Sequence, residues 1–459
     1  MKKSIFGVGL LLSLLIFSGA ICKSKDTSPS TIVLKYWSVV NSDADLRGAF
    51  DAFAVKYPYI QVEYRQLNIQ NYEDELISAW AQGEGPDIFS IPNSHLGKFE
   101  DLIEPMPATI AITSVETKES LGQKELVVTP QTLSTISVQQ LGSSFPQVVS
   151  DDVVMVHKAT SKDKATEKIF ALPLSMDTMV LYYNKDMLSQ AKIALPPETW
   201  DQFVEQVPRL TLVDIDNNII QSGAALGTSN NIPRSFDIIS LLMLQNGAVM
   251  TSGSNVTFQT DLKERRGYNP GNQAVEFYTS FANPDVEWYS WNADQSDALE
   301  SFIDGDTAFY FGYHYDLKQI NNRAPNLNFD LAPMPQVNIN NNINYANYWL
   351  ETVSINSKVT DEAWALIEAI TTENAKVKKY LTATKKPSAL KTLLEEQKED
   401  YVLSVFADQS LTAQSWYAGS QPKEVEDQFA DMITIINEGR LDVNTAVKNT
   451  ASKVALTYD

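Results

Sequence analysis

Cysteine and histidine are scarce in this chain of 459 residues, which contains one cysteine and three histidines. A single cysteine cannot form an intramolecular disulfide or a cysteine-based zinc site. The histidines, His95, His157 and His314, lie far apart in the sequence and form no metal-binding motif of the His-Glu-x-x-His kind. We therefore predict no disulfide framework, no metal ion and no other cofactor.

Basic residues are also few, with 36 Lys and Arg against 57 Asp and Glu, a net charge of -21. A surface this acidic repels phosphate backbones and anionic lipid headgroups, so the composition argues against a nucleic-acid partner. Aromatic residues are plentiful, because the chain has 8 Trp, 19 Tyr and 19 Phe. That supply can build a large core, which excludes disorder over the whole length.

Catalytic motifs are absent as well. The sequence contains neither a G-x-S-x-G nucleophile turn nor a G-x-x-x-x-G-K-[ST] phosphate loop. Carboxylates are so numerous that a pair suited to glycoside hydrolysis carries no information. The sequence alone therefore does not indicate an enzyme.

One long apolar run is present, from Ile5 to Ile21, preceded by the basic Met1–Lys3 and followed at once by Cys22. This is the layout of a secretory signal, so we predict a signal peptide at residues 1–21 and a polar tether at residues 22–30. A sole cysteine at this position resembles the lipidation cysteine of a bacterial lipoprotein. We therefore predict that Cys22 carries a lipid that holds the protein at the outer face of the cytoplasmic membrane.

The match to the lipoprotein pattern is imperfect, because Gly19-Ala20-Ile21 stands where Leu is usual at the first position and a small residue at the last. Cleavage after Ala20 would leave Cys22 as a free thiol, and an uncleaved membrane anchor is the other alternative. All three interpretations export residues 23–459. No other segment approaches the roughly 18 apolar residues that span a bilayer.

Strand and helix patterns alternate from residue 31 onwards. Thr31–Trp37, Tyr59–Tyr64 and Asp87–Ile91 have strand patterns, and an amphipathic helix pattern lies in each interval. This β-α-β-α-β order with short connections predicts a parallel, doubly wound α/β sheet. Ligands bind beyond the carboxyl ends of the strands in such sheets, which here means Ser38–Asn41 and Pro92–His95.

The rest of the chain is less uniform. Residues 107–168, rich in Ser, Thr, Val and Gln, predict no clear element. Beyond them we expect a strand at Thr178–Asn184, a helix capped by Thr199, and an almost wholly helical tail over residues 360–459. Further helices are expected near residues 234–246, 271–282 and 295–303, and further strands near 307–312, 327–332 and 345–354.

Aromatic residues gather beside polar ones at the ends of predicted elements. The clusters are Trp288–Asn292, Gly312–Tyr315, Tyr345–Trp349 and Ser415–Tyr417. A pyranose has apolar faces and a rim of hydroxyls, so ring faces beside hydrogen-bonding groups suit a sugar. We predict sugar contacts for Trp291 and Trp349. We assign Trp37, Trp80, Trp200 and Trp364, which lie on regular strand or helix patterns, to the core.

Over residues 31–450 the sequence resembles the extracellular solute-binding proteins of carbohydrate ABC importers, the family that includes maltose-binding proteins. The resemblance rests on the order and spacing of several short motifs. They are Tyr36-Trp37, Ala49-Phe50, Tyr57-Pro58, Val62–Tyr64, Gly85–Phe89, Ala171–Thr178, Tyr182–Asp186, Pro197–Phe203 and Leu331–Pro335.

The resemblance implies two doubly wound α/β lobes joined by hinge crossings, the type II periplasmic-binding-protein fold, which closes around its ligand. Lobe one would comprise residues 30–172 plus 350–385, and lobe two residues 173–349 plus 386–459. The crossings would fall near Leu172–Ser175, Asn347–Val353 and Lys385–Ser388.

The resemblance also implies ligand-binding positions. These are Ser38, Val40, Asn41, Asn93, His95, Asp177, His314 and Trp416. His314 stands where the family usually has Trp, which weakens the expectation of ring stacking there. Glu351, next to Trp349 at the second crossing, completes the predicted site.

The function that follows is a monomeric, non-enzymatic protein that binds a sugar or oligosaccharide and delivers it to the transmembrane subunits of an ABC permease. One alternative is a surface enzyme acting on glycans. Another is a sugar-sensing receptor lipoprotein that feeds a signalling protein.

Overall fold

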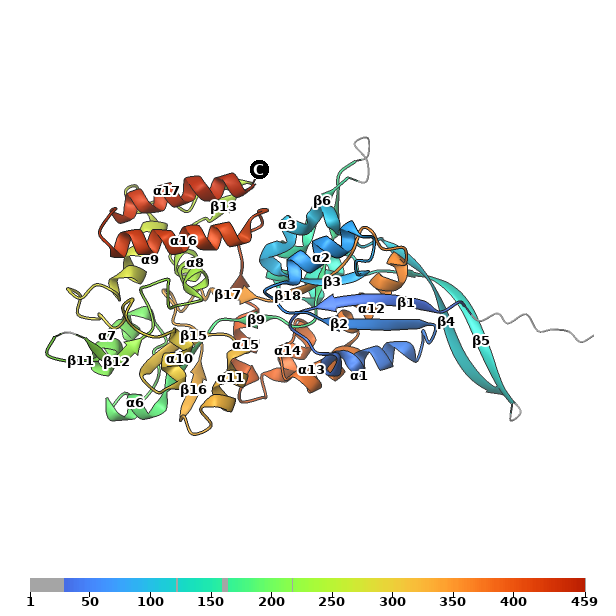
Figure 1. Cartoon of the computed structure of the whole chain (residues 1–459), viewed down its shortest axis with the longest axis horizontal. Helices are drawn as coiled ribbons and strands as arrows, with labels where there is room; N and C mark the ends of the chain where they lie inside the picture. The colour runs from blue at the N-terminus through green and yellow to red at the C-terminus, as the bar shows by residue number, and fades with distance from the viewer. Residues whose placement is uncertain (1–28, 121–122, 159–163, 217, 459) are drawn as a thin grey trace, which may run out of the picture.

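The computed structural model of the chain describes residues 29–120, 123–158, 164–216 and 218–458. The predicted signal peptide and Cys22 lie outside these residues. Within them, no helix combines the length and apolar character that a membrane crossing requires. Figure 1 shows two lobes side by side, connected by segments that include β9 (Asp177–Thr178) and β17 (Asn344–Asn347).

The first lobe is built on the predicted parallel sheet. Strand β1 (Ile32–Ser38) pairs with β2 (Ile60–Gln66) along its full length, from Ile32 opposite Ile60 to Ser38 opposite Gln66, and with β3 (Ile88–Pro92) on its other side. The spatial order is β2 (Ile60–Gln66), β1 (Ile32–Ser38), β3 (Ile88–Pro92), β18 (Trp349–Val353) and β8 (Leu172–Pro173). The predicted β-α-β-α-β order is therefore confirmed, although β18 is antiparallel to β3.

The first helix of this lobe has both features that predicted it from the sequence, a capping residue and an apolar stripe. Ser42 caps α1 (Asp43–Ala54) by accepting from the backbone of Asp45, whose carboxylate accepts in turn from the Ser42 backbone. The apolar stripe of α1 is buried, and its members are Leu46, Ala49, Phe50 and Phe53. In α2 (Tyr72–Ala81), Tyr72 and Leu76 are buried, whereas Ala79 and Trp80 are half-buried.

The second lobe has a mixed five-stranded sheet. Its spatial order is β11 (Leu212–Val213), β12 (Ile219–Ala224), β15 (Thr307–Gly312), β10 (Val180–Asn184) and β16 (Phe329–Ala332). Its helices include α6 (Lys185–Gln190), α7 (Trp200–Leu210), α8 (Ser235–Gln245), α9 (Pro270–Ser280), α10 (Ala298–Ile303) and α11 (Asp316–Arg323). Thr199 caps α7 as predicted, because its hydroxyl accepts from the backbone N–H of Gln202.

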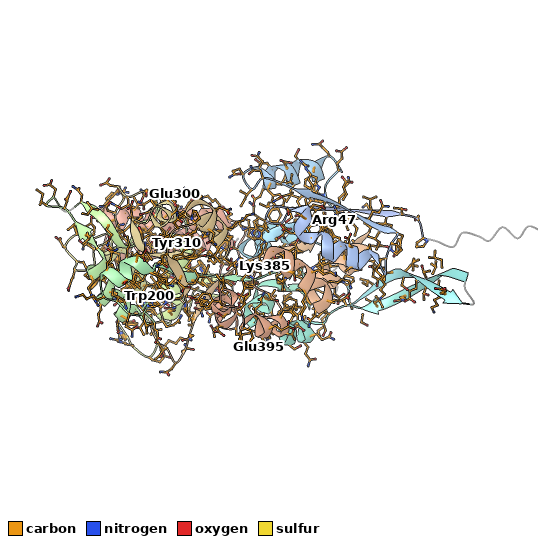
Figure 2. The ribbon with its side chains drawn as sticks, turned by 90° about the horizontal axis from the view of Figure 1, so that it is seen from below. Arg47, Trp200, Glu300, Tyr310, Lys385 and Glu395 are labelled. Atoms are coloured by element: carbon orange, nitrogen blue, oxygen red, sulfur yellow. The ribbon has the colours of Figure 1, made fainter. Side chains whose placement is uncertain are left out.

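The lobes are joined by a small sheet in which β17 lies between β19 (Ala413–Gln414) and β9. Strand β9 belongs to the first crossing, and β17 leads through Tyr348 into β18 of the first lobe. A third crossing runs beside the first, where Ser175 and Ser388 form an isolated bridge. In Figure 2, Lys385 on this third crossing lies at the junction, with Arg47 in one lobe and Trp200 and Tyr310 in the other.

Each lobe has its own hydrophobic core. The first contains side chains from Leu34 to Met176 and from Ala346 to Leu393, together with Ala413. The second contains side chains from Met179 to Tyr345 and from Phe406 to Val454. After the third crossing, Ala389, Leu390 and Leu393 pack into the first core, so this core extends past the predicted boundary at residue 385.

The segment that the sequence left unassigned contains a long β-hairpin. Strand β4 (Thr109–Ser120) pairs with β5 (Gln123–Ser134) in continuous antiparallel register from Thr109 opposite Ser134. Figure 1 shows this ribbon extending beyond the body of the first lobe. The segment continues with α4 (Val138–Ser144), α5 (Gln147–Val153), β6 (Val154–His157) and β7 (Thr166–Ile169).

The tail is mainly helical, as predicted, but it is interrupted by β19. Its helices are α12 (Thr360–Thr372), α13 (Asn374–Thr384), α14 (Lys391–Gln397), α15 (Leu403–Ser410), α16 (Pro422–Asn437) and α17 (Val443–Ala455). Helix α13 packs on α1 in the first lobe, and α16 packs on α17 and α8 in the second. The tail therefore contributes helices to both lobes, so the chain crosses the junction once more within it.

Candidate functional site

A cavity of about 380 Å³ lies at the junction, and both lobes and all three crossings contribute to its lining. This volume falls within the usual range for small-molecule sites. Six of the predicted site residues line it, namely Val40, Asn41, Asp177, His314, Trp349 and Glu351. The fold thus brings together groups that lie more than 300 positions apart in the sequence.

Asp177 lies on β9, opposite Asn347 of β17. Its Oδ2 accepts a hydrogen bond of 2.9 Å from the backbone N–H of His314, and its Oδ1 accepts one of 2.9 Å from that of Thr178. Burial raises the pKa of Asp177 to about 8, against the opposing effect of these two donors. The carboxyl group is thus held in a fixed orientation by the backbone of the second lobe.

Asn41 follows β1 and forms part of the first-lobe wall. Its Oδ1 accepts from the Tyr380 hydroxyl at 3.0 Å and from Lys386 Nζ at 2.9 Å. Because the amide oxygen takes both bonds, the amide nitrogen is left to donate to a ligand. The carboxyl end of β1 therefore supplies a polar group, as the sheet topology predicted.

Glu351 and Trp349 both come from β18, but they differ in burial. Glu351 is only 1% exposed, its Oε2 accepts from Ser90 Oγ at 2.5 Å, and burial raises its pKa to about 7. Trp349 is half-buried, and its ring centroid lies 6.3 Å from that of Tyr72. Trp349 can therefore offer part of a ring face to a ligand, while Glu351 lies deeper beneath it.

The second-lobe wall contains an aromatic and cationic cluster that our sequence reasoning did not assemble. The rings of Tyr313 and Tyr315 are stacked with centroids 5.8 Å apart, and the Arg234 guanidinium lies 5.3 Å and 5.5 Å from these centroids. Arg234 Nε donates to the Tyr315 hydroxyl at 2.8 Å, and the Arg234 side chain lies 3.6 Å from Asp237. Arg234 and Tyr315 line the cavity, whereas Asp237 is buried outside this lining, beside Arg234.

Lys386 is a second charged cavity residue that the prediction did not include. It lies on the third crossing, within the predicted range Lys385–Ser388, but nothing in the sequence shows that its side chain turns towards Asn41. Tyr315 lies within an aromatic cluster that the sequence did single out. Arg234 precedes α8 without a motif of its own, so no sequence signal could have identified it.

The remaining predicted residues lie elsewhere. Ser38 is fully buried at the end of β1, and His95 packs beside Glu73, with 3.4 Å between Nε2 and the carboxylate. Trp291 is fully buried in the second core, where its Nε1 donates to Asn231 Oδ1 at 3.0 Å. Trp291 therefore lines no part of the described cavity, and the placement is that of a core residue.

Asn93 and Trp416 both line a second cavity, of about 540 Å³. This cavity lies beside β19, whereas the first cavity lies beside β9. Trp416 is mostly buried against Phe429, and its Nε1 donates to Ser240 Oγ at 3.0 Å. Asn93 Nδ2 donates to Asp152 Oδ2 at 3.0 Å. Both side chains are thus already engaged with protein partners.

Stability should fall as the pH rises from 6.5 to 8. The pKa values of Asp177 (about 8) and Glu351 (about 7) are raised above 3.8 and 4.5, so the folded chain binds more protons there than the unfolded chain. Below pH 6.5, His95 and His314 have the opposite effect, and they lower the stability as the pH falls. The reason is that burial lowers their pKa values from 6.5 to about 4. Urea midpoints at pH 6.5 and 8 should show the decline, and Asp177→Asn should reduce it. An equal decline in the variant would contradict this origin.

In the described part of the chain, no group of three or more His, Cys, Asp or Glu side chains is arranged to hold an ion. Aromatic faces, hydroxyls, an amide and charged groups surround the junction cavity instead. Such a lining suits reversible binding of a polar ligand with apolar faces. Both lobes and all three crossings thus form one cavity whose lining combines aromatic faces with polar groups.

Residues 48–402 match the family described as bacterial extracellular solute-binding protein, and this is more than half of the chain. The chain therefore belongs to that family. The resemblance inferred from the sequence motifs is confirmed, and the family is one of extracellular binding proteins.

Solved structures agree on the fold. A cyclo/maltodextrin-binding protein complexed with maltotetraose superimposes with a TM-score of 0.68 at 16% identity, covering 94% of this chain and 98% of the other. The sugar-binding protein MalE from Xanthomonas citri gives 0.67 at 16% identity, covering 93% and 97%. A solute-binding protein from Thermotoga lettingae bound to alpha-D-tagatose gives 0.64 at 18%, covering 94% and 100%. The predicted fold, two α/β lobes with hinge crossings, is confirmed.

Proposed function

We propose that this protein binds a sugar or oligosaccharide in the junction cavity and delivers it unchanged to an ABC permease. The observation that carries the proposal is the cavity itself, which both lobes enclose and which pairs the partly exposed ring of Trp349 with polar groups such as Asn41 and Asp177. Structural neighbours are described as complexes with maltotetraose, maltose and alpha-D-tagatose, which supports a saccharide ligand.

Ligand capture should be detectable as thermal stabilisation. A molecule that binds only the folded state raises the unfolding midpoint by mass action, by about 2.7 kcal/mol at one hundred times its dissociation constant. The exported chain, residues 23–459, is screened against a library of mono- and oligosaccharides, and at least one should raise the midpoint. Recovery of the bound sugar unaltered supports a binding protein, whereas its cleavage would overturn the non-enzymatic assignment.

The same ligand should also draw the lobes together. The crossings Leu172–Ser175, Asn347–Val353 and Lys385–Ser388 are the proposed hinge, and a ligand contacting Asn41 on one side and Tyr315 on the other favours the closed arrangement. Solution scattering should record a smaller radius of gyration at saturation. An unchanged scattering curve would count against a hinged site.

The proposed location is the outer face of the cytoplasmic membrane, with the monomeric protein held by a lipid on Cys22. The support is the sequence: a sole cysteine directly follows the apolar run Ile5–Ile21. Mass spectrometry of the N-terminus from native membranes should find residue 22 first and lipid-modified. A mature chain beginning at Ile21, or one that retains residues 1–20, would exclude the anchor without affecting the proposed site.

A further inference from the structure

Two cationic side chains face the junction cavity from different parts of the fold. Arg234 enters from the second lobe, at the residue before α8, and Lys386 enters from the third crossing. Lys386 Nζ donates to Asn41 Oδ1 at 2.9 Å and lies 3.5 Å from the carbonyl oxygen of Val40. Among the described residues it has no carboxylate within 4.0 Å, whereas most lysines that contact protein groups here are paired with Asp or Glu.

The carboxyl groups around the cavity are already satisfied by protein donors. Asp177 accepts from two backbone N–H groups, and Glu351 accepts from Ser90. Asp237 accepts from the Tyr313 hydroxyl at 2.8 Å while facing Arg234. Asp237 offsets Arg234 in part, whereas Asp177 and Glu351 interact with Lys386 electrostatically but form no ion pair with it within 4.0 Å.

The protonation of these groups adds to the positive balance near neutral pH. Burial raises the pKa of Asp177 to about 8 and that of Glu351 to about 7, so neither carries its full negative charge. Asp316 has its pKa raised by burial only to about 6, so it stays mostly ionised at neutral pH and offsets part of the charge of Arg234. His314 contributes no charge, because burial lowers its pKa to about 4.

We infer that the ligand is an anionic saccharide, whose carboxylate or phosphate binds between Lys386 and Arg234 while its ring contacts Trp349 and Tyr315. The inference rests on the proposed sugar-binding function and names the class of sugar. A guanidinium offers a planar pair of donors to an oxyanion and an ammonium offers a compact charge, so the two together suit a carboxylate or a phosphate ester. The Arg234–Tyr315 hydrogen bond holds the guanidinium beside the ring that the sugar would contact.

The net charge of -21 does not contradict an anionic ligand. Exposed charges are screened over about 8 Å at physiological ionic strength, so the surface affects the approach of the ligand more than its final contacts. Inside the cavity the nearest charges dominate, because the interaction between two charges falls as their separation grows.

The test compares matched pairs of ligands by titration calorimetry. One arm uses oligogalacturonides and the same oligosaccharides after reduction of their carboxyl groups, and the other uses hexose phosphates and the parent hexoses. We expect at least tenfold tighter binding of the charged member in one arm, which also identifies the anion as carboxylate or phosphate. Lys386→Gln should lower that preference at least fivefold, and Arg234→Gln should do the same.

Lys379→Gln is the matched control, because Lys379 is exposed, lies on α13 outside the crossings and is absent from the lining of this cavity. It should leave the preference unchanged, and thermal melts establish that each variant is folded. If neutral saccharides bind as tightly as charged ones, or if both cavity variants keep the wild-type preference, the inference is wrong and the proposed function stands. If no saccharide of either kind binds in the library screen, the proposed function fails as well.

Discussion

Replacing Trp291 with alanine should lower the free energy of unfolding by about 3–5 kcal/mol. The ring is fully buried in the second core, so truncation leaves a cavity that its neighbours cannot fill. The change also removes the donor to Asn231 Oδ1, an oxygen that still accepts from Thr228 Oγ1 at 2.5 Å. Urea denaturation, followed by circular dichroism, measures the loss directly.

Trp349→Ala, compared with Trp291→Ala, distinguishes a tryptophan that binds the ligand from one that stabilises the fold. Trp349 is half-buried and lines the cavity, so its removal should shift the urea midpoint far less than Trp291→Ala does. It should instead weaken binding of the cognate sugar at least tenfold, equivalent to about 1.4 kcal/mol. If Trp349→Ala unfolds as early as Trp291→Ala, the ring is a structural part of the hinge and the site is wrongly placed.

These two tryptophans show what aromatic clustering in a sequence can predict. Both lie beside polar residues at the ends of elements, and both were predicted to contact a sugar. Trp349 occupies the first position of β18, at the end of this strand that meets the junction. Trp291 follows a loop that turns back into the second core, where Ser290 and Trp291 donate to the carbonyl of Phe281. Local composition does not distinguish these outcomes, because tertiary packing decides them.

The periodic elements were predictable because each buries a face that its sequence already displays. The α1 stripe from Leu46 to Phe53 and the strands β1 and β2 have apolar spacings that match their observed burial. The β4–β5 hairpin lacked that signal. Ile110, Ile112 and Val115 are buried along β4, but Thr and Ser occur on both faces, so the alternation is weak.

The cationic part of the site was not predictable for a different reason. Arg234 and Lys386 lie about 150 positions apart, and each belongs to a segment with no recognised motif. They line the same cavity only because α8 begins at the junction and the third crossing passes through it. The carboxyl-end rule for parallel sheets identified Asn41, but it cannot identify Arg234 before α8 or Lys386 on the third crossing, since neither residue belongs to a sheet.

Asp152→Ala should also cost about 3–5 kcal/mol, because Asp152 is the shared acceptor of three side chains at the junction. Its Oδ2 accepts from Asn93 Nδ2 at 3.0 Å and from the Tyr348 hydroxyl at 2.5 Å, and its Oδ1 accepts from the Ser415 hydroxyl. These donors come from the first lobe, the second crossing and the segment after β19. Alanine would leave all three without this acceptor, and two of them, Asn93 and Tyr348, are buried, where an unsatisfied donor is costly.

Asp151→Ala is the matched control, since Asp151 is the exposed neighbour on α5 and accepts a hydrogen bond from Gln147 at the surface. Its effect should stay within about 0.5 kcal/mol, as expected for an exposed substitution. Asp152→Asn should lie between the two, because an amide oxygen can still accept while the amide nitrogen faces a donor. If Asp152→Ala and Asp151→Ala share a urea midpoint, water from the adjacent 540 Å³ cavity must replace the carboxylate. The three donors would then bond to this water instead of to Asp152, and the segments that carry them would stay in place.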